Sequence, residues 1–149
     1  CQRRLKETLM DNIDEFLAHV RENIDQHGWH AQGVGARPDR PTYTYTVGLT
    51  AMGFEELVVV GLLPSQAHEV LTGGVRLLQD GVGLHAGRIV QGLLEGLPIK
   101  TTDCSNEHLN VARSVYGVEV MAVQLVWPDA AGRFPGEPGH DDSLPSQRL

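Results

Sequence analysis

The residues that could do acid–base chemistry gather in two short motifs far apart in the chain. His27-Gly28-Trp29 places an imidazole two residues before an indole, and residues 127–141 place Asp129 and Glu137 on either side of an arginine. A histidine beside a carboxylate can transfer protons near neutral pH, because its charge changes there. We therefore expect the candidate catalytic residues to be His27, Asp129 and Glu137.

Polar and aromatic residues in these motifs, and in residues 45–49, could line a pocket. A guanidinium holds carboxylates or phosphates, and a glycine within a strand lets a ligand or another backbone come close. The pattern predicts a site for a small polar or anionic ligand, with these ligand-binding residues: Trp29, Tyr45, Thr46, Gly48, Trp127 and Arg133.

Each motif also has an ordinary structural explanation. His27 suits the end of a helix, where a basic residue meets the helix dipole. Tyr45 and Thr46 suit a strand through packing alone. Asp129 suits an Asx-turn, and its pairing with Arg133 at the surface would contribute at most about 1 kcal/mol.

A metal centre is not predicted. His27 and His30 lie three residues apart, but a metal needs three or four ligands, and the other candidates, His140, Asp141 and Asp142, are remote in sequence. Metal binding by His27, His30 or His140 stays an open question.

No cofactor is predicted either. Residues 81–87 are glycine-rich, but they lack the Lys-Ser/Thr ending of a phosphate-binding loop. Cys104 follows Asp103 in an acidic stretch, which would not lower the pKa of a thiol. The cofactor is therefore unknown, and no nucleophile motif is found.

Composition limits the class of protein and its partners. The chain has 149 residues, of which 41% are hydrophobic, so we expect one globular domain rather than a disordered chain. The net charge of −7 comes without a basic stripe, which argues against nucleic acid or an anionic membrane as the main partner. The longest apolar run, residues 57–63, is too short to cross a bilayer.

These features favour a cytoplasmic protein. Because the chain begins with Cys1 rather than Met, we expect that its extreme N-terminus is missing. A lipid-modified Cys1 left after removal of a signal peptide is the alternative.

Periodicity predicts the elements that must position these residues. Apolar residues recur every three or four positions in helices, and alternate in strands. Helices are expected at 5–26, from Pro64 to Gly81, and at 106–116 after a Ser105 N-cap, and strands at 29–35, 43–50, 56–62, 118–127 and, once or twice, within 88–103.

The resulting order is α-β-β-β-α-β-α-β. Three consecutive strands with short connections favour antiparallel pairing. We therefore predict an α+β fold with three helices and a mainly antiparallel sheet of about five or six strands. Residues 1–135 would form a single domain, and residues 136–149 a polar, proline-rich tail.

Four motifs occur in an order that resembles one bacterial family. They are His27-Gly28-Trp29, residues 45–49, residues 56–62, and residues 124–129 with Gly132-Arg133-Phe134-Pro135. Together they resemble the family called domain of unknown function 4262 over about residues 10–141. The resemblance implies no assigned activity.

The tail departs from the family pattern at two positions. Members tend to carry an aromatic residue where this chain has Gly136, and a tyrosine where it has His140. A pocket lined by that aromatic residue would be altered or more open in this chain.

Three functions remain open. The first is a domain that binds a small polar or anionic ligand between its motifs, with acid–base catalysis as an extension. The second is a non-enzymatic interaction module of the immunity-like or regulatory kind, which uses an acidic surface. The third is a split-barrel flavin binder. The sequence decides neither whether the protein is an enzyme nor its oligomeric state.

Overall fold

The computed structural model describes residues 2–149, and their side chains from residue 12 onward. The elements are α1 (Gln2–His27), β1 (His30–Val34), β2 (Tyr43–Val47), the 3-10 helix η1 (Thr50–Met52), β3 (Glu56–Val60), α2 (Pro64–Gln79), β4 (Ile89–Leu94), β5 (Leu97–Cys104), α3 (Asn110–Tyr116) and β6 (Ala122–Val126). Over these residues, three α-helices and a six-stranded sheet confirm the predicted α+β class.

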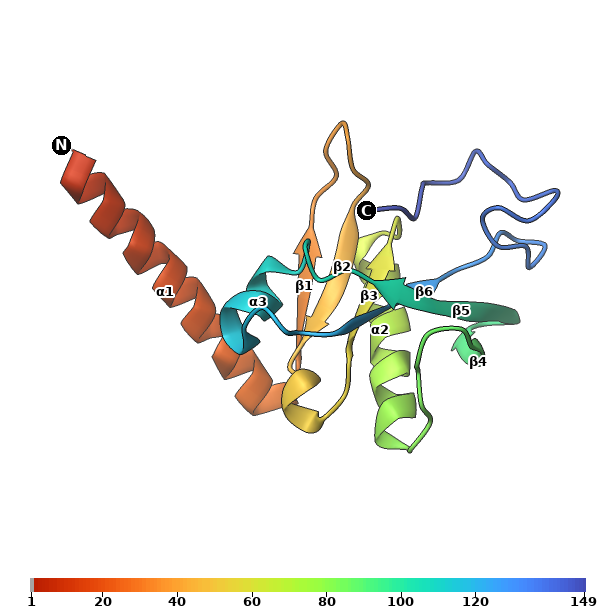
Figure 1. Ribbon diagram of the computed structural model, residues 1–149, viewed down its shortest axis with the longest axis horizontal. Helices are drawn as coiled ribbons and strands as arrows, with labels where there is room; N and C mark the ends of the chain where they lie inside the picture. The colour runs from red at the N-terminus through yellow and green to blue at the C-terminus, as the bar shows by residue number, and fades with distance from the viewer. Residues whose placement is uncertain (1) are drawn as a thin grey trace.

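The sheet is open and runs in the order β1-β2-β3-β6-β5-β4 (Figure 1). Every neighbouring pair is antiparallel except β3 and β6, which are parallel. The sheet is therefore mainly antiparallel, as predicted. Strands β1 and β4 form the two edges of the sheet.

Each face of the sheet is covered by a different set of helices. One core lies under α2 and contains Leu57 and Leu125 from the strands with Leu71 from the helix. The other core contains Tyr45 and Val58, together with residues of α1 and α3. Successive strand residues point to opposite faces, so β3, which lies between the two cores, is buried along its whole length. This explains its nearly continuous run of apolar residues.

The C-terminal part of α1 packs against the sheet through Val20 and Ile24. Figure 1 shows the helix running away from the strands toward the N-terminus. Val20 is fully buried in the second core, whereas Ile13 and Phe16 are 57% and 42% exposed. No helix in the part of the chain that the structure describes combines the length and the apolar character needed to cross a membrane.

The predicted element order needs one correction. The order was written with one strand between the second and third helices, although one or two were expected within residues 88–103, and the structure has two, β4 and β5, which form a hairpin joined at Glu95 and Gly96. Gly96 has a φ of +71°, a left-handed conformation that suits a glycine in a tight turn.

The third helix starts later than predicted. It begins at Asn110 rather than at residue 106, and Ser105 does not cap it. Instead, the Asn106 amide donates to the carbonyl oxygens of Val118 and Val120, both at 2.8 Å. These bonds hold Asn106 in the loop that faces residues 118–120, and β6 accordingly begins only at Ala122.

The segment after β6 has neither helix nor strand, yet it packs back on the sheet. Leu144 contacts the core under α2, and Leu149 contacts the core on the other face. Gln147 is 8% exposed. The predicted tail, residues 136–149, is therefore anchored at several points along its length.

Candidate functional site

Thr46 is engaged by a buried carboxylate that the sequence analysis overlooked. Glu56, at the start of β3, is fully buried, and its Oε1 accepts hydrogen bonds from Thr46 Oγ1 at 2.8 Å and from the Leu49 backbone at 3.1 Å. Its Oε2 accepts from the backbone N–H and the hydroxyl of Thr50. Thr46 Oγ1 in turn accepts from the Leu57 backbone. Thr46 therefore stabilises the end of β2 rather than facing a ligand.

Gly48 brings the two N-terminal motifs into contact. Its φ is +132°, and a Cβ placed on it would lie 2.9 Å from both the Gly28 carbonyl oxygen and Trp29 Cα. Only a glycine leaves room for this close approach of a second backbone. The approach predicted for a ligand or another backbone is thus made by the backbone of residues 28–29.

Tyr45 faces the opposite side of the sheet from Thr46. Its hydroxyl accepts a hydrogen bond from the Val111 backbone at 3.0 Å, and its side chain is buried in the core that α3 covers. Burial raises the pKa of Tyr45 to about 12, so the phenol stays protonated at neutral pH. Tyr45 and Thr46 cannot line one pocket, because adjacent strand residues point to opposite faces.

His27 and Trp29 line a cavity of about 540 Å³ between α1, β1 and α2. The ring of Trp29 stacks on that of His68, with 5.6 Å between ring centroids. His30 lines the same cavity, and its ring nitrogens lie 3.0 Å from Asn23 Nδ2 and from Gln32 Oε1. We call this the histidine cavity.

The described residues contain no group of three or more His, Cys, Asp or Glu side chains placed to hold a metal ion. The histidine cavity therefore has imidazoles but no set of ligands with metal-binding geometry. The thiol of Cys104 is partly buried, and burial raises its pKa to about 11. That thiol is protonated at neutral pH.

Trp127 and the loop after it lie at the C-terminal end of β3, at Val60, whereas Glu56 lies at its start. Because β3 and β6 are parallel, Trp127 follows β6 at the end where β3 also finishes. Five strand residues span roughly 13 Å. Trp127 Nε1 donates to the Val60 carbonyl oxygen at 2.8 Å. The motifs thus form two groups, one at each end of β3, and the structure does not bring all the predicted site residues together.

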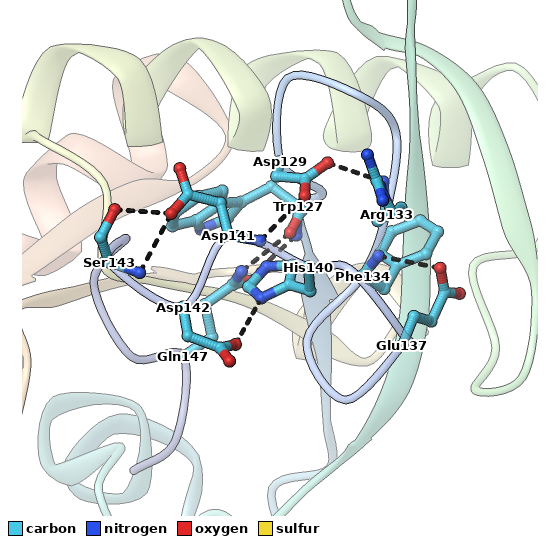
Figure 2. Close-up of polar contacts among 10 residues, drawn as sticks. All are labelled: Trp127, Asp129, Arg133, Phe134, Glu137, His140, Asp141, Asp142, Ser143 and Gln147. Atoms are coloured by element: carbon cyan, nitrogen blue, oxygen red, sulfur yellow. Dashed lines mark hydrogen bonds and ion pairs between the residues drawn. The ribbon is translucent and has the colours of Figure 1, made fainter.

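Asp129 holds the loop after β6 in shape (Figure 2). Its Oδ1 accepts from the Arg133 backbone at 2.9 Å and from the Ala131 backbone at 3.0 Å, and its Oδ2 accepts from the Asp141 backbone at 3.0 Å. These bonds, with that from Arg133 the largest influence, lower the pKa of Asp129. Asp129 therefore stays ionised and occupied by backbone donors.

The other two predicted residues of this loop are exposed. The Glu137 carboxylate accepts from the Phe134 backbone at 3.2 Å. The Arg133 guanidinium lies against Gly139, where a Cβ would overlap its Nη1. Each of these side chains thus contacts the backbone of the loop after β6, to which it belongs.

The end of the chain is held against Trp127 by Gln147, as Figure 2 shows. The Trp127 backbone N–H donates to Gln147 Oε1 at 3.0 Å, and Gln147 Nε2 donates to the Trp127 carbonyl oxygen at 2.8 Å. The Gln124 side chain donates to the Gln147 carbonyl oxygen at 2.7 Å. The Gln147 side chain thus bonds both the N–H and the carbonyl oxygen of Trp127, as the backbone of a neighbouring strand would.

A cavity of about 460 Å³ lies between this segment and the sheet. We call it the tail cavity. From the sheet it is lined by residues that pair across β5 and β6, Lys100 with Val126 and Thr102 with Gln124. From the loop and tail it is lined by Phe134, Pro135, Gly136, His140, Asp142, Leu144, Pro145, Ser146, Gln147 and Arg148.

His140 is the chemically distinctive residue of the tail cavity. Its side chain is 8% exposed, and its Nδ1 lies 3.0 Å from Asp142 Oδ1. An ionised carboxylate only accepts hydrogen bonds, so this contact assigns the proton to Nδ1. Nε2 is buried and has no hydrogen-bond partner among the residues that the structure describes. The sequence offered two hints of this residue, its nearness to Asp142 and its departure from the family tyrosine.

Comparison with known families agrees with the four motifs. A family model described as Domain of unknown function (DUF4262) matches residues 23–141. The match takes in both motif groups and begins within α1. The family resemblance of the four motifs is thereby confirmed. No curated protein and no solved structure matches the chain significantly.

Proposed function

The chain belongs to the DUF4262 family, and on that premise we propose that it binds a small polar or anionic ligand in the tail cavity. One observation carries the proposal. The imidazole of His140 is almost completely buried, its Nε2 lacks a partner among the described residues, and His140 is one of the residues that line a cavity of about 460 Å³. Buried polar atoms in proteins nearly always have partners, so an orphan beside a cavity supports a missing ligand contact.

The charge of the lining supports an anion. Lys100 on β5 and Arg148 near the end of the chain both line the tail cavity, and Asp142 is the acidic residue of the lining. The Asp142 carboxylate is already paired with His140. Two cations therefore remain to attract negative charge, within a protein whose net charge is −7.

The same geometry supports an acid–base role. An imidazole whose Nδ1 is held by a carboxylate can use its other nitrogen for proton transfer with a ligand that reaches it. In this proposal, His140 oriented by Asp142 exchanges a proton with the ligand, in place of the expected His27. Asp129 and Glu137 shape the loop that borders the cavity, because both carboxylates accept from backbone N–H groups.

The test is a titration of the protein with small anions, followed by NMR of backbone and histidine signals. We expect the largest shifts at residues that line the tail cavity. Lys100→Ala and Arg148→Ala should each weaken binding by about 3- to 10-fold, since each removes one attracting charge. Arg76→Ala is the matched control, because it removes the same charge from an exposed site on α2.

The proposal would be contradicted by any of three results. One is the absence of binding by any anion of the panel. Another is an equal loss of affinity in Arg76→Ala and in both cavity variants, which would indicate attraction by overall charge alone. Shifts confined to the histidine cavity are the third.

A further inference from the structure

We infer that the anion held in the tail cavity keeps an O–H group, and that this O–H donates a hydrogen bond to Nε2 of His140. The inference rests on the proposed function and narrows it to a class of ligand. Hydrogen phosphate and hydroxy carboxylates belong to that class, whereas sulfate and simple carboxylates do not.

The first step is the direction of the hydrogen bond between His140 and Asp142. The two atoms, Nδ1 and Oδ1, lie 3.0 Å apart, and the Asp142 side chain is 91% exposed. An ionised carboxylate has no proton to donate and only accepts hydrogen bonds. The imidazole must therefore donate from Nδ1, and a neutral ring then carries its lone pair on Nε2.

The second step is that no group in the described part of the chain donates a hydrogen bond to His140 Nε2. It is buried and unpaired among the described residues. Both side-chain amides of the lining already donate elsewhere, Gln124 Nε2 to the Gln147 carbonyl oxygen at 2.7 Å and Gln147 Nε2 to the Trp127 carbonyl oxygen at 2.8 Å. A buried acceptor without a donor is unfavourable, so a ligand that supplies one is preferred over a ligand that cannot.

The third step concerns the rest of the ligand. Lys100 and Arg148 carry only donors, so they suit the negatively charged oxygens of an anion. In a neutral imidazole with its proton on Nδ1, Nε2 is an acceptor and would face a negatively charged oxygen unfavourably. The cavity thus favours a small molecule that carries both a charged oxygen and a hydroxyl.

Access requires a small movement of the chain. Nε2 is out of reach of solvent in the structure, so the segment that carries His140 must shift for a ligand to touch it. That segment is exposed at Pro138 and Gly139, and Gly139 has a φ of +83°. Hydrogen–deuterium exchange on ligand addition would register this shift at residues 139–142.

Two matched pairs of ions test the inference. In mildly alkaline buffer, where a histidine is ordinarily neutral, hydrogen phosphate and sulfate have the same charge and nearly the same size, but only the former has a hydroxyl. Lactate and propionate differ in the same way. Calorimetry should show that the hydroxylated member of at least one pair binds about tenfold more tightly, a difference of about 1.4 kcal/mol.

Two variants connect that preference to His140. Asp142→Asn should bring the ratio within a pair close to one, because an amide can present either oxygen or nitrogen to Nδ1 and no longer fixes the proton there. Asp142 is exposed, so this variant should fold normally. His140→Phe should also abolish the ratio, and Asp80→Asn, which removes a charge at the end of α2, should leave it unchanged.

The outcomes separate the two proposals. A preference for hydrogen phosphate alone would assign the ligand to phosphorus oxyanions, and a preference for lactate alone to hydroxy carboxylates; either supports the inference. Equal binding within both pairs would overturn it while leaving the proposed anion site intact. No binding of any of the four would overturn both, and a ratio that survives in Asp142→Asn would overturn the role of His140.

Discussion

At the scale of single residues, two buried side chains outside the predicted site, Glu56 and His140, differ in how far their hydrogen bonds are satisfied. Glu56 gathers four donors from the end of β2 and from η1, so its carboxylate replaces the backbone partners that the strand loses there. His140 has the opposite character, since one of its ring nitrogens has no partner in the described part of the chain. A buried group whose hydrogen bonds are all made indicates a structural role. A buried group that lacks a hydrogen-bond partner and lies beside a cavity indicates a ligand.

Glu56→Gln should lower the free energy of unfolding by about 1.5–3 kcal/mol. The amide would turn one acceptor oxygen into a donor that faces other donors, either at Thr46 and Leu49 or at Thr50. Chemical denaturation measures the change. Glu55→Gln is the matched control, because Glu55 is partly exposed and makes only a 3.7 Å contact with His85. A loss below about 0.5 kcal/mol for Glu56→Gln would contradict its role.

The ionised form of Asp129 should stabilise the loop only above a certain pH. Its pKa is lowered from 3.8 by backbone hydrogen bonds, with the bond from Arg133 the largest influence. A pKa that is lower in the folded state gives stability above the unfolded value, and that stability is lost as the pH falls through the folded value.

We therefore expect the wild-type protein to be more stable than Asp129→Asn at neutral pH, and the difference to shrink below pH 3.8. Denaturation curves at a series of pH values provide the measurement. Asp25→Asn, on the exposed face of α1, is the control and should show no such trend. A difference that stays constant with pH would show that ionisation of Asp129 is unimportant.

At the scale of elements, the junctions between motifs depend on close backbone contacts and on one glutamine. The end of β2 meets the start of β1 at Gly48, where a Cβ would lie 2.9 Å from two backbone atoms. The tail meets the end of β6 through the two hydrogen bonds of Gln147. Each junction lies at a different end of β3, so the two can be perturbed separately.

Gly48→Ala should destabilise the fold by about 2–3 kcal/mol, because the backbone of residues 28–29 must move and the residue takes on a left-handed φ. Gly53→Ala is the control. It also has a positive φ, of +86°, but a Cβ there meets nothing within 4 Å. Strain alone should cost it about 1–2 kcal/mol. Equal losses in the two variants would show that the contact with residues 28–29 is unimportant.

Gln147→Ala should release the tail from the sheet without unfolding the domain. The variant leaves the backbone N–H and carbonyl of Trp127 without partners, a loss of about 1–3 kcal/mol locally. Hydrogen exchange at the Trp127 amide should accelerate accordingly. Ser146→Ala, at an exposed neighbouring position, should leave that exchange rate unchanged. Protection of Trp127 that survives in Gln147→Ala would contradict this account.

At the scale of the whole molecule, α1 belongs to the folded unit only in part. Val20→Ala should lower the free energy of unfolding by about 1–2 kcal/mol, because Val20 is fully buried in the second core. Phe16→Ala, one turn earlier and 42% exposed, should change it by about 0.5 kcal/mol or less. Thermal or chemical denaturation compares the two, and an equal loss would place Phe16 in the core.

The local patterns of the sequence predicted most elements, because helix and strand periodicities are properties of neighbouring residues. The boundaries of β2 and α3 were wrong by several residues. At Leu49 and Thr50 the backbone turns toward the Glu56 carboxylate, and at Asn106 the amide bonds a segment twelve residues away. Such partners are distant in the chain, and no local pattern reveals them.

For the candidate site, the sequence located the loop after β6 but not the residue that matters most within it. Asp129, Arg133 and Glu137 stood out by type, and they lie in that loop. His140 was noted only as a metal candidate and a departure from the family pattern. Its burial and the missing partner at Nε2 arise from the packing of the loop and tail around it.

By itself, the sequence determined the α+β class, the approximate elements and the family, since these follow from periodicity and from motifs in a fixed order. The tertiary structure decided where those motifs meet. Strand β6 inserts beside β3 and runs parallel to it, which places His27-Gly28-Trp29 and the Trp127 loop at opposite ends of one strand. Some sixty residues of chain separate β3 from β6. Which strands pair over such a distance depends on how much surface each arrangement of the whole chain buries, so no single segment predicts it.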